Sequence, residues 1–367
     1  MHKLLKPTIL SISLLTVMAG AAMSPALGSI SRAFPDASPQ LIKMVLSLPA
    51  VMIILFSIVS GQLTSFISKK MILITGLIIY LVGGLGAAFT GTVYQLLLFR
   101  ALLGIGVGLL TPLSVAVIAD FFEGHERAQM VGLAPAVSCL GGVIANFAGG
   151  FLAEISWRYA CGIYCLAIFS LVLIVVVLPD QPPSTRGKAV RNGYKHLPAS
   201  VYALAILQLL LMLVFFAIPT NLATFMQNQA IGDAALAGGA LALLNIMGFV
   251  GGLVFNALFK RFGQYALLLG LICMTAGFWL LSLSHQAYSV MAGATVLGLG
   301  FGILQPLIYL KTTQAVSPFL LPVAMSLISS SLFLGQFLSP LVLTVVGNVM
   351  GNSGSRFTFQ FLSLVLL

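Results

Sequence analysis

Long runs of apolar residues recur along the whole chain and are separated by short polar breaks. A helix needs about 20 apolar residues to cross the roughly 30 Å hydrocarbon layer of a bilayer. Strands of membrane barrels are shorter and alternate in polarity, so runs of this length predict helices. The pattern predicts eleven membrane spans, at about 8–31, 41–66, 71–91, 93–118, 129–153, 159–179, 198–222, 235–258, 264–284, 288–310 and 320–346.

The two ends of the chain leave alternatives open. The first run follows a short basic stretch from His2 to Lys6 and is similar to a signal peptide. Its match to a later span, given below, favours a retained helix instead. A twelfth apolar run begins at Phe357 and stops at Leu367. Eleven helical residues rise only about 16 Å, so we expect an incomplete sequence with a truncated last helix; the alternative is a short stub.

The composition excludes a water-soluble domain. Hydrophobic residues make up 60% of the 367 residues and charged residues only 7%, whereas soluble domains carry about 25% charged residues. The net charge of +10 does not indicate a nucleic-acid partner, because the basic residues lie between the apolar runs and form no stripe. With the amino terminus inside, twelve basic residues fall in inner segments and four in outer ones. This bias predicts a multi-pass protein of the cell membrane with a cytoplasmic amino terminus.

An internal repeat divides the chain. A shift of 194 residues lays the segment from Gly104 to Leu113 on the segment from 298 to 307, with six of ten positions identical. The same shift lays Pro25 on Pro219 and Gly141 on Gly335. Six spans are an even number, so both copies enter the membrane in the same orientation, as in transporters with two parallel halves. We therefore predict an all-α fold of two parallel six-helix bundles, at 1–180 and 198–367, joined by a cytoplasmic linker at 181–197.

Four segments resemble motifs of the major facilitator superfamily, in particular its twelve-span drug–proton antiporter branch. Between spans 2 and 3 that family carries G-x-L-x-D-R-x-G-R-R, of which this chain keeps Gly61, Leu63, Lys69 and Lys70 but has Ser65 in place of the aspartate. The resemblance implies a weaker or different inner gate. The alternative is a basic loop that serves topology alone.

Span 4 carries the family's R-x-x-x-G-x-G pattern as Arg100, Gly104 and Gly106, extended to Gly108. A guanidinium inside the bilayer costs about 3 kcal/mol and is expected to face a polar interior. The alternative is that Arg100 snorkels to the outer interface. Glycines let helix backbones approach closely and give a rocking helix a smooth surface.

Span 5 is similar to the family's antiporter motif, G-x8-G-x3-G-P-x2-G-G. The chain keeps the glycines at this spacing but has Ala145 and Asn146 at the glycine–proline pair, so a kink is not ensured. The second copy does carry a proline, Pro340, after Gly335. The spacing favours export, whereas the alternative is tight helix packing alone. The span 5 glycines are Gly132, Gly141, Gly149 and Gly150.

The resemblance also implies a central cavity lined by spans 1, 4, 7 and 10. Those spans carry candidate ligand contacts of three kinds, namely flexible apolar side chains, amides and one cation. They are Met18, Met23, Arg100, Thr111, Gln208, Phe215, Asn221, Gln305 and Tyr309. All seven acids lie at span ends or in loops, so no buried counter-charge is available for a bare organic cation.

These observations predict a secondary transporter that moves a small amphipathic, neutral or anionic solute by alternating access, with export favoured. An importer or uniporter of the same fold remains the alternative. All four histidines fall in loops or at the terminus and no acid lies within a span, so no metal or other cofactor is predicted and a membrane-embedded enzyme is only a remote alternative. A signalling scaffold leaves the repeat unexplained. We expect a monomer whose partners are its solute and the lipid bilayer.

Overall fold

The computed structural model describes residues 2–180, 197–263, 265–317, 320–352 and 354–366. The chain divides into two compact units, Met1–Ala189 and Val190–Leu367. The predicted linker, 181–197, lies outside the described residues except at its last position. Each unit consists of long helices, and we describe each by itself.

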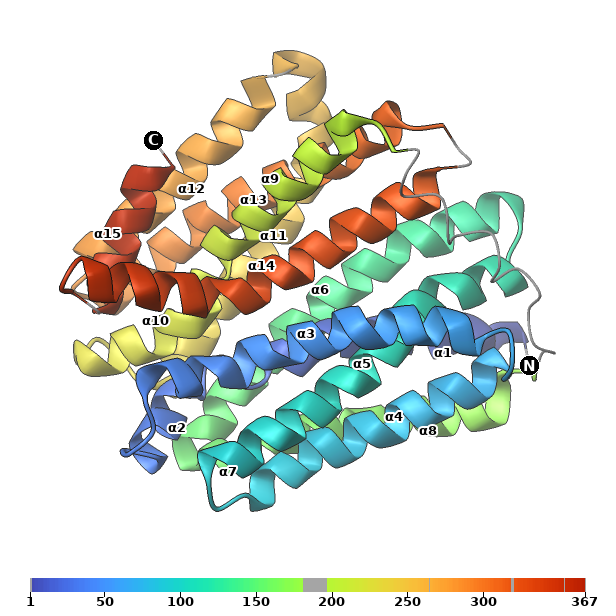
Figure 1. Cartoon of the computed structure of the whole chain (residues 1–367), viewed down its shortest axis with the longest axis horizontal. Helices are drawn as coiled ribbons and strands as arrows, with labels where there is room; N and C mark the ends of the chain where they lie inside the picture. The colour runs from blue at the N-terminus through green and yellow to red at the C-terminus, as the bar shows by residue number, and fades with distance from the viewer. Residues whose placement is uncertain (1, 181–196, 264, 318–319, 353, 367) are drawn as a thin grey trace. The chain divides into compact units, whose positions relative to one another are not determined.

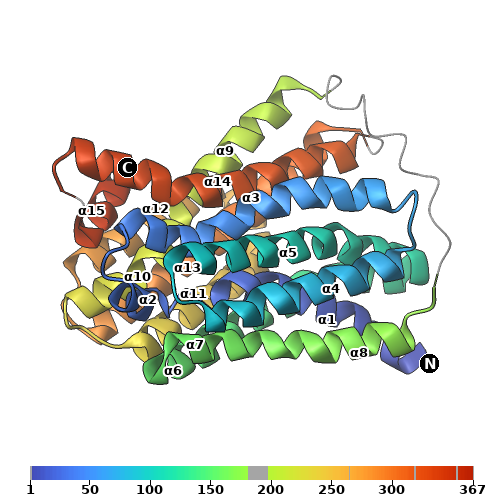
Figure 2. The same cartoon turned by 60° about the horizontal axis from the view of Figure 1, so that its bottom comes forward.

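The first unit is built on eight α-helices within its described residues (Figure 1). Two 3₁₀ turns, Ala87–Phe89 and Cys161–Cys165, extend α4 and join α7 to α8. Figures 1 and 2 both show α3, α5 and α4 side by side. The helices are α1 His2–Ala21, α2 Leu27–Ala33, α3 Pro39–Leu63, α4 Lys69–Gly86, α5 Val93–Phe121, α6 Gly124–Ile155, α7 Trp157–Ala160 and α8 Leu166–Val177.

The second unit has seven α-helices within its described residues. The predicted twelfth run forms the last of them, which begins at Ser355. The helices are α9 Ala199–Phe215, α10 Ala217–Asn228, α11 Ala234–Phe262, α12 Tyr265–Leu283, α13 Ala287–Ala315, α14 Leu321–Val349 and α15 Ser355–Val365.

The two units pack their helices in the same way. In the first, α5 packs against α3 and α4, α1 against α6, and α4 against α8. In the second, α13 packs against α11 and α12, α9 against α14, and α12 against α15. The order of these helices along each copy of the repeat is the same, so each pair in one unit has its counterpart in the other. The repeat found in the sequence is therefore also a repeat of helix packing.

Eleven helical segments in the described part of the chain are long and apolar enough to cross a membrane, as many as the sequence predicts. The fold class predicted from the sequence, an all-α membrane protein, is confirmed. The individual boundaries are less accurate, because helices continue past the apolar run that predicts them. For example, α13 extends to Ala315, five residues beyond the predicted end of span 10.

Two of the predicted spans, 1 and 7, contain a turn that interrupts the α-helix. Span 1 is interrupted by a turn over residues 22–26, between α1 and α2, and span 7 is interrupted at Phe216. The interruptions coincide under the 194-residue shift, next to Pro25 and Pro219. A proline has no amide hydrogen to donate, so it weakens the helix at this point in both copies.

Candidate functional site

The interruption after α1 leaves a backbone carbonyl free for side chains. In a continuous α-helix the amide of Met23 would donate to the carbonyl of Ala19. Here the Met23 amide donates instead to the Gly20 carbonyl at 3.3 Å. The Ala19 oxygen accepts two side-chain hydrogen bonds, from Arg100 Nη2 at 2.8 Å and from the Tyr164 hydroxyl at 3.0 Å.

Arg100 is completely buried, with 0% of its surface exposed. Besides the bond to Ala19, its Nε donates to the Val45 carbonyl at 2.8 Å and its Nη1 donates to the Tyr164 hydroxyl at 2.7 Å. The Val45 carbonyl is also free of a helical donor, because the residue four positions on is Pro49. The guanidinium therefore joins α1, α3 and α5 to the turn before α8 through uncharged acceptors. The alternative that Arg100 snorkels to the interface is wrong.

The other predicted residues of spans 1 and 4 lie close to this arginine or along the same helices. Met18 and Met23 are buried, and the Met23 sulfur lies 3.9 Å from the Cys161 sulfur. Thr111 is half-buried and its hydroxyl donates to the Val107 carbonyl of its own helix at 2.8 Å. These side chains are engaged in packing and local hydrogen bonds.

In the second unit, four of the predicted residues come together between α9 and α13. Gln208 Nε2 donates to Gln305 Oε1 at 3.2 Å, and the Tyr309 hydroxyl is hydrogen-bonded to Gln305. One to two turns along, the rings of Phe215 and Phe301 stack with their centroids 3.8 Å apart. The amide oxygen of Gln208 is buried and has no hydrogen-bond partner within the described residues.

Asn221 lies on α10, beyond the interruption of span 7. Its Nδ2 donates to the Ala217 carbonyl at 2.8 Å, while its Oδ1 is buried without a partner in the part of the chain that the structure describes. An unpartnered buried acceptor is costly. Gln208 and Asn221 thus each hold a buried acceptor for which the described residues supply no donor.

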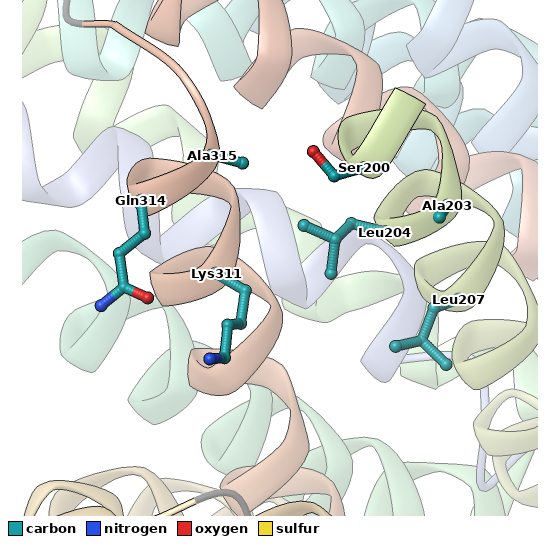
Figure 3. Close-up of a pocket in the computed structure, with 7 residues that line it drawn as sticks. All are labelled: Ser200, Ala203, Leu204, Leu207, Lys311, Gln314 and Ala315. Atoms are coloured by element: carbon teal, nitrogen blue, oxygen red, sulfur yellow. The ribbon is translucent and has the colours of Figure 1, made fainter. Parts of the chain in front are cut away.

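A groove with a volume of about 440 Å³ lies between α9 and α13 (Figure 3). Sequence reasoning missed it and used Lys311 only to assign topology. The signal was present in the helical spacing, since positions 200, 204 and 207 share one face of α9. Its lining residues are Ser200, Ala203, Leu204 and Leu207 on α9 and Lys311, Gln314 and Ala315 on α13.

The basic pair of the predicted inner gate lies at the beginning of α4. Lys69 forms an ion pair with Asp120 at the end of α5, and Lys70 Nζ donates to the Val175 carbonyl of α8 at 2.9 Å. Gly61 is exposed and has open space around it, and Leu63 is half-buried. Lys69 is thus paired with an acid from another helix, while the role of this segment in an inner gate stays a prediction.

The span 4 glycines face neighbouring backbones. A Cβ on Gly106 would lie 2.7 Å from the Gly76 carbonyl oxygen, and a Cβ on Gly300 would lie 2.7 Å from the Gly270 oxygen. Each residue of the second pair is 194 positions after its counterpart in the first. Gly104 and Gly108 face α3 in the same way.

The span 5 helix, α6, runs without interruption through Ala145 and Asn146. A Cβ on Gly141 would clash with the Leu14 carbonyl, and one on Gly149 with the Ala22 carbonyl, both of the first span. Gly150 is buried, and the surroundings of Gly132 lie outside the described residues.

In the second unit, Gly335 of α14 faces α9 in the same manner. Pro340 is buried within α14. The neighbouring Ser339 hydroxyl donates to the Leu213 carbonyl at 2.6 Å. Leu213 is the repeat counterpart of Ala19, so the same carbonyl accepts from a serine hydroxyl in the second unit and from Arg100 and the Tyr164 hydroxyl in the first.

Comparisons with known proteins place these features in a family. The model of the Major Facilitator Superfamily matches residues 9–340. The bacillibactin exporter of Bacillus subtilis is 24% identical over 355 residues, covering 90% of this chain and 86% of that protein. The multidrug transporter protein MdtP of Bacillus subtilis is 29% identical over 102 residues, which span 28% of this chain but only 19% of that protein.

Solved structures show the same fold at low sequence identity. A point mutant of the nucleoside transporter NupG has a TM-score of 0.79 at 14% identity, covering 99% of this chain and 98% of that one. The D-xylose-proton symporter has a TM-score of 0.72 at 17% identity, covering 99% of this chain and 95% of that one.

Proposed function

The chain belongs to the Major Facilitator Superfamily, and on that premise we propose that it is a secondary active exporter of a small amphipathic, neutral or anionic solute. Membership makes it a multi-pass membrane transporter. The solute, the direction and the mechanism are the proposal. It acts by alternating access as a monomer, with the solute and the lipid bilayer as its partners.

The observation that carries alternating access is the repeated packing of the two units. The glycine contacts of α5 with α4 recur between α13 and α12 at the same 194-residue offset. Two bundles of similar construction, each packed within itself, can rock as rigid bodies about a site at the membrane midplane. Opening one side of the site then closes the other.

The charge distribution supports a cytoplasmic amino terminus. Lys6 at the start of α1 pairs with Glu126 at the start of α6, at 2.8 Å. Lys69 pairs with Asp120, which lies at the end of α5. These ion pairs gather at the end of the first unit to which the positive-inside bias assigns the cytoplasm.

The chemistry between α9 and α13 supports a solute without a bare positive charge. Amides, a tyrosine and stacked phenylalanine rings lie there. Three of the acids are engaged within the protein. Asp120 and Glu126 form ion pairs with lysines, and Asp233 caps α11 by accepting from the Leu236 amide at 3.0 Å. A buried organic cation without a carboxylate partner would be unstable in this environment.

Export is favoured by the span 5 spacing and by the exporter that aligns along most of the chain. A symporter shares the fold, so import and uniport are the competing functions. Purified protein in proteoliposomes, supplied with a panel of neutral, anionic and cationic fluorescent solutes, tests all three. Movement from the cytoplasmic side that stops when a protonophore collapses the proton gradient supports proton-coupled export. Movement that persists unchanged favours uniport, and uptake alone favours import.

A matched pair of variants tests the site. Gln208→Leu keeps the side-chain volume but removes the amide, and we expect its transport rate to fall at least about fivefold at low solute concentration. Gln360→Leu changes an exposed glutamine of the same unit and should leave transport intact. Equal rates in both variants and the wild type would rule out the α9–α13 amides as solute contacts.

A further inference from the structure

The helices α9 and α13 touch over one part of their length and separate over another. Phe215 stacks on Phe301, and Gln208 is hydrogen-bonded to Gln305. Beyond the glutamine pair, toward the beginning of α9 and the end of α13, the two helices enclose the 440 Å³ groove. The glutamine pair therefore lies beside the groove on the side where the helices meet.

The groove is open and its lining surface is mostly apolar, with the polar side chains of α13 contributing a small part of it. Leu204, Leu207 and Ala203 project from α9, and Lys311 and Gln314 project from α13 (Figure 3). Its volume falls in the range of about 300–1,000 Å³ that is usual for small-molecule sites. An apolar surface beside a cation is complementary to a molecule with an apolar body and an anionic head.

The charge of Lys311 is uncompensated within the described residues of its own unit. Its side chain is exposed, and it forms no ion pair with any residue that the structure describes. Asp233 is the only acid in residues 190–367, and it is engaged at the start of α11. No carboxylate of this unit is therefore free to neutralise the ammonium group.

We propose that the α9–α13 groove binds the anionic head of an amphipathic carboxylate or sulfonate solute, with Lys311 as the counter-charge. The apolar body lies along the leucines of α9. Lys311 is then a specificity-determining residue that selects anions over neutral analogues. This inference rests on the proposed transport function and narrows its substrate class. The positive-inside bias places the groove at the cytoplasmic end, so loading from inside agrees with export.

Binding of a fluorescent amphipathic acid tests the proposal. Dansylglycine carries one carboxylate, its methyl ester is the neutral analogue, and dansyl-ethylenediamine is the cationic one. Each is titrated against the purified full chain in dodecyl maltoside, an uncharged detergent. We expect dansylglycine to bind at least about tenfold more tightly than its ester and to lose this advantage in high salt.

Variants of Lys311 separate its charge from its volume. Lys311→Gln should weaken dansylglycine binding about tenfold and leave the ester unchanged, whereas Lys311→Arg should retain the preference for the acid. The control is Lys260→Gln, which removes an exposed lysine at the end of α11 in the same unit. Equal losses in the two glutamine variants, or no preference for the acid over the ester, would overturn the proposal.

Anionic lipid is the competing occupant of a cationic groove. In nanodiscs, replacing phosphatidylcholine by phosphatidylglycerol should leave dansylglycine binding within about twofold if a solute occupies the groove. Displacement of the probe by phosphatidylglycerol in the wild type but not in Lys311→Gln would assign the groove to lipid and refute the solute.

The two proposals fail in different ways. If solute export is established but Lys311→Gln exports anions as well as the wild type does, the groove assignment is wrong and the transport function stands. If dansylglycine binds in a Lys311-dependent way but no solute of the panel is moved, the binding site stands and the proposed function fails.

Discussion

Replacing Arg100 by methionine removes a buried cation and keeps most of its apolar volume. Three acceptors each lose a hydrogen bond from the guanidinium. The Val45 carbonyl also lacks a helical donor, whereas the Ala19 carbonyl keeps its bond from the Tyr164 hydroxyl. The helices are already inserted in the membrane before they pack against one another. The cost of placing the guanidinium in the membrane is therefore largely the same in the unpacked and the packed state, and it cancels in the free energy of unfolding. The lost hydrogen bonds therefore decide the sign, and Arg100→Met is destabilising.

The magnitude follows from the three bonds. Hydrogen bonds between membrane helices contribute about 0.6 kcal/mol on average and up to about 1.7 kcal/mol, so three of them amount to about 2–5 kcal/mol. For a unit of this size, 1 kcal/mol corresponds to about 2–4 °C in melting temperature. We expect the apparent Tm to fall by roughly 4–20 °C.

The measurement is the fraction of monodisperse protein that remains, by size-exclusion chromatography, after heating in dodecyl maltoside. Arg100→Lys should lose part of this stability, because an ammonium group cannot hold the three acceptors in a planar fork. Tyr164→Phe should lose less than Arg100→Met, since it removes the two bonds of the Tyr164 hydroxyl but keeps the bonds of Arg100 to the Ala19 and Val45 carbonyls. Arg127→Met, at an exposed arginine, is the control. An Arg100→Met variant with the same apparent Tm as this control would refute the reasoning.

Three further predictions concern helix packing and the ends of the spans. Gly106→Val should abolish the monodisperse peak, because even a Cβ would lie 2.7 Å from the facing backbone oxygen of α4. The control Gly61→Val lies in open space and should fold. Equal yields of monodisperse protein from the two variants would contradict this. Lys69→Gln or Asp120→Asn should lower the apparent Tm by no more than about 4 °C, because a partly exposed ion pair contributes under about 1 kcal/mol; a larger fall would assign the pair a buried role. Ser339→Ala should cost about 1 kcal/mol, seen as a melting temperature about 2–4 °C lower, and an unchanged value would mean that its bond to α9 contributes nothing.

Local sequence features account for much of the fold. The length and polarity of the apolar runs predict the spans. In the hydrocarbon layer, a single segment can satisfy the hydrogen bonds of its own backbone only by forming a helix. The repeat is found from the match of the segments that begin at Gly104 and Gly298. The structure confirms it, because α5 and α13 pack in the same way against the helices of their own units. The cost of a buried charge likewise predicts that Arg100 faces polar groups.

Prolines show where local sequence is insufficient. Span 1 is interrupted beside Pro25, yet α3 and α6 continue through Pro49 and Pro135. The same residue type therefore accompanies a break in one helix and lies within intact helices elsewhere. The outcome depends on which neighbouring groups take over the freed carbonyls, and at Val45 that group is an arginine 55 residues away along the chain.

The sequence by itself determined that the chain forms membrane helices in two related copies and that it holds one costly cation among them. Only the tertiary structure decided that Ala19, Val45 and Tyr164 satisfy that cation, and that Gln208 meets Gln305 beside a groove containing Lys311. Polarity and periodicity act within one helix, whereas hydrogen-bond partners and grooves depend on how helices far apart in the chain are packed together.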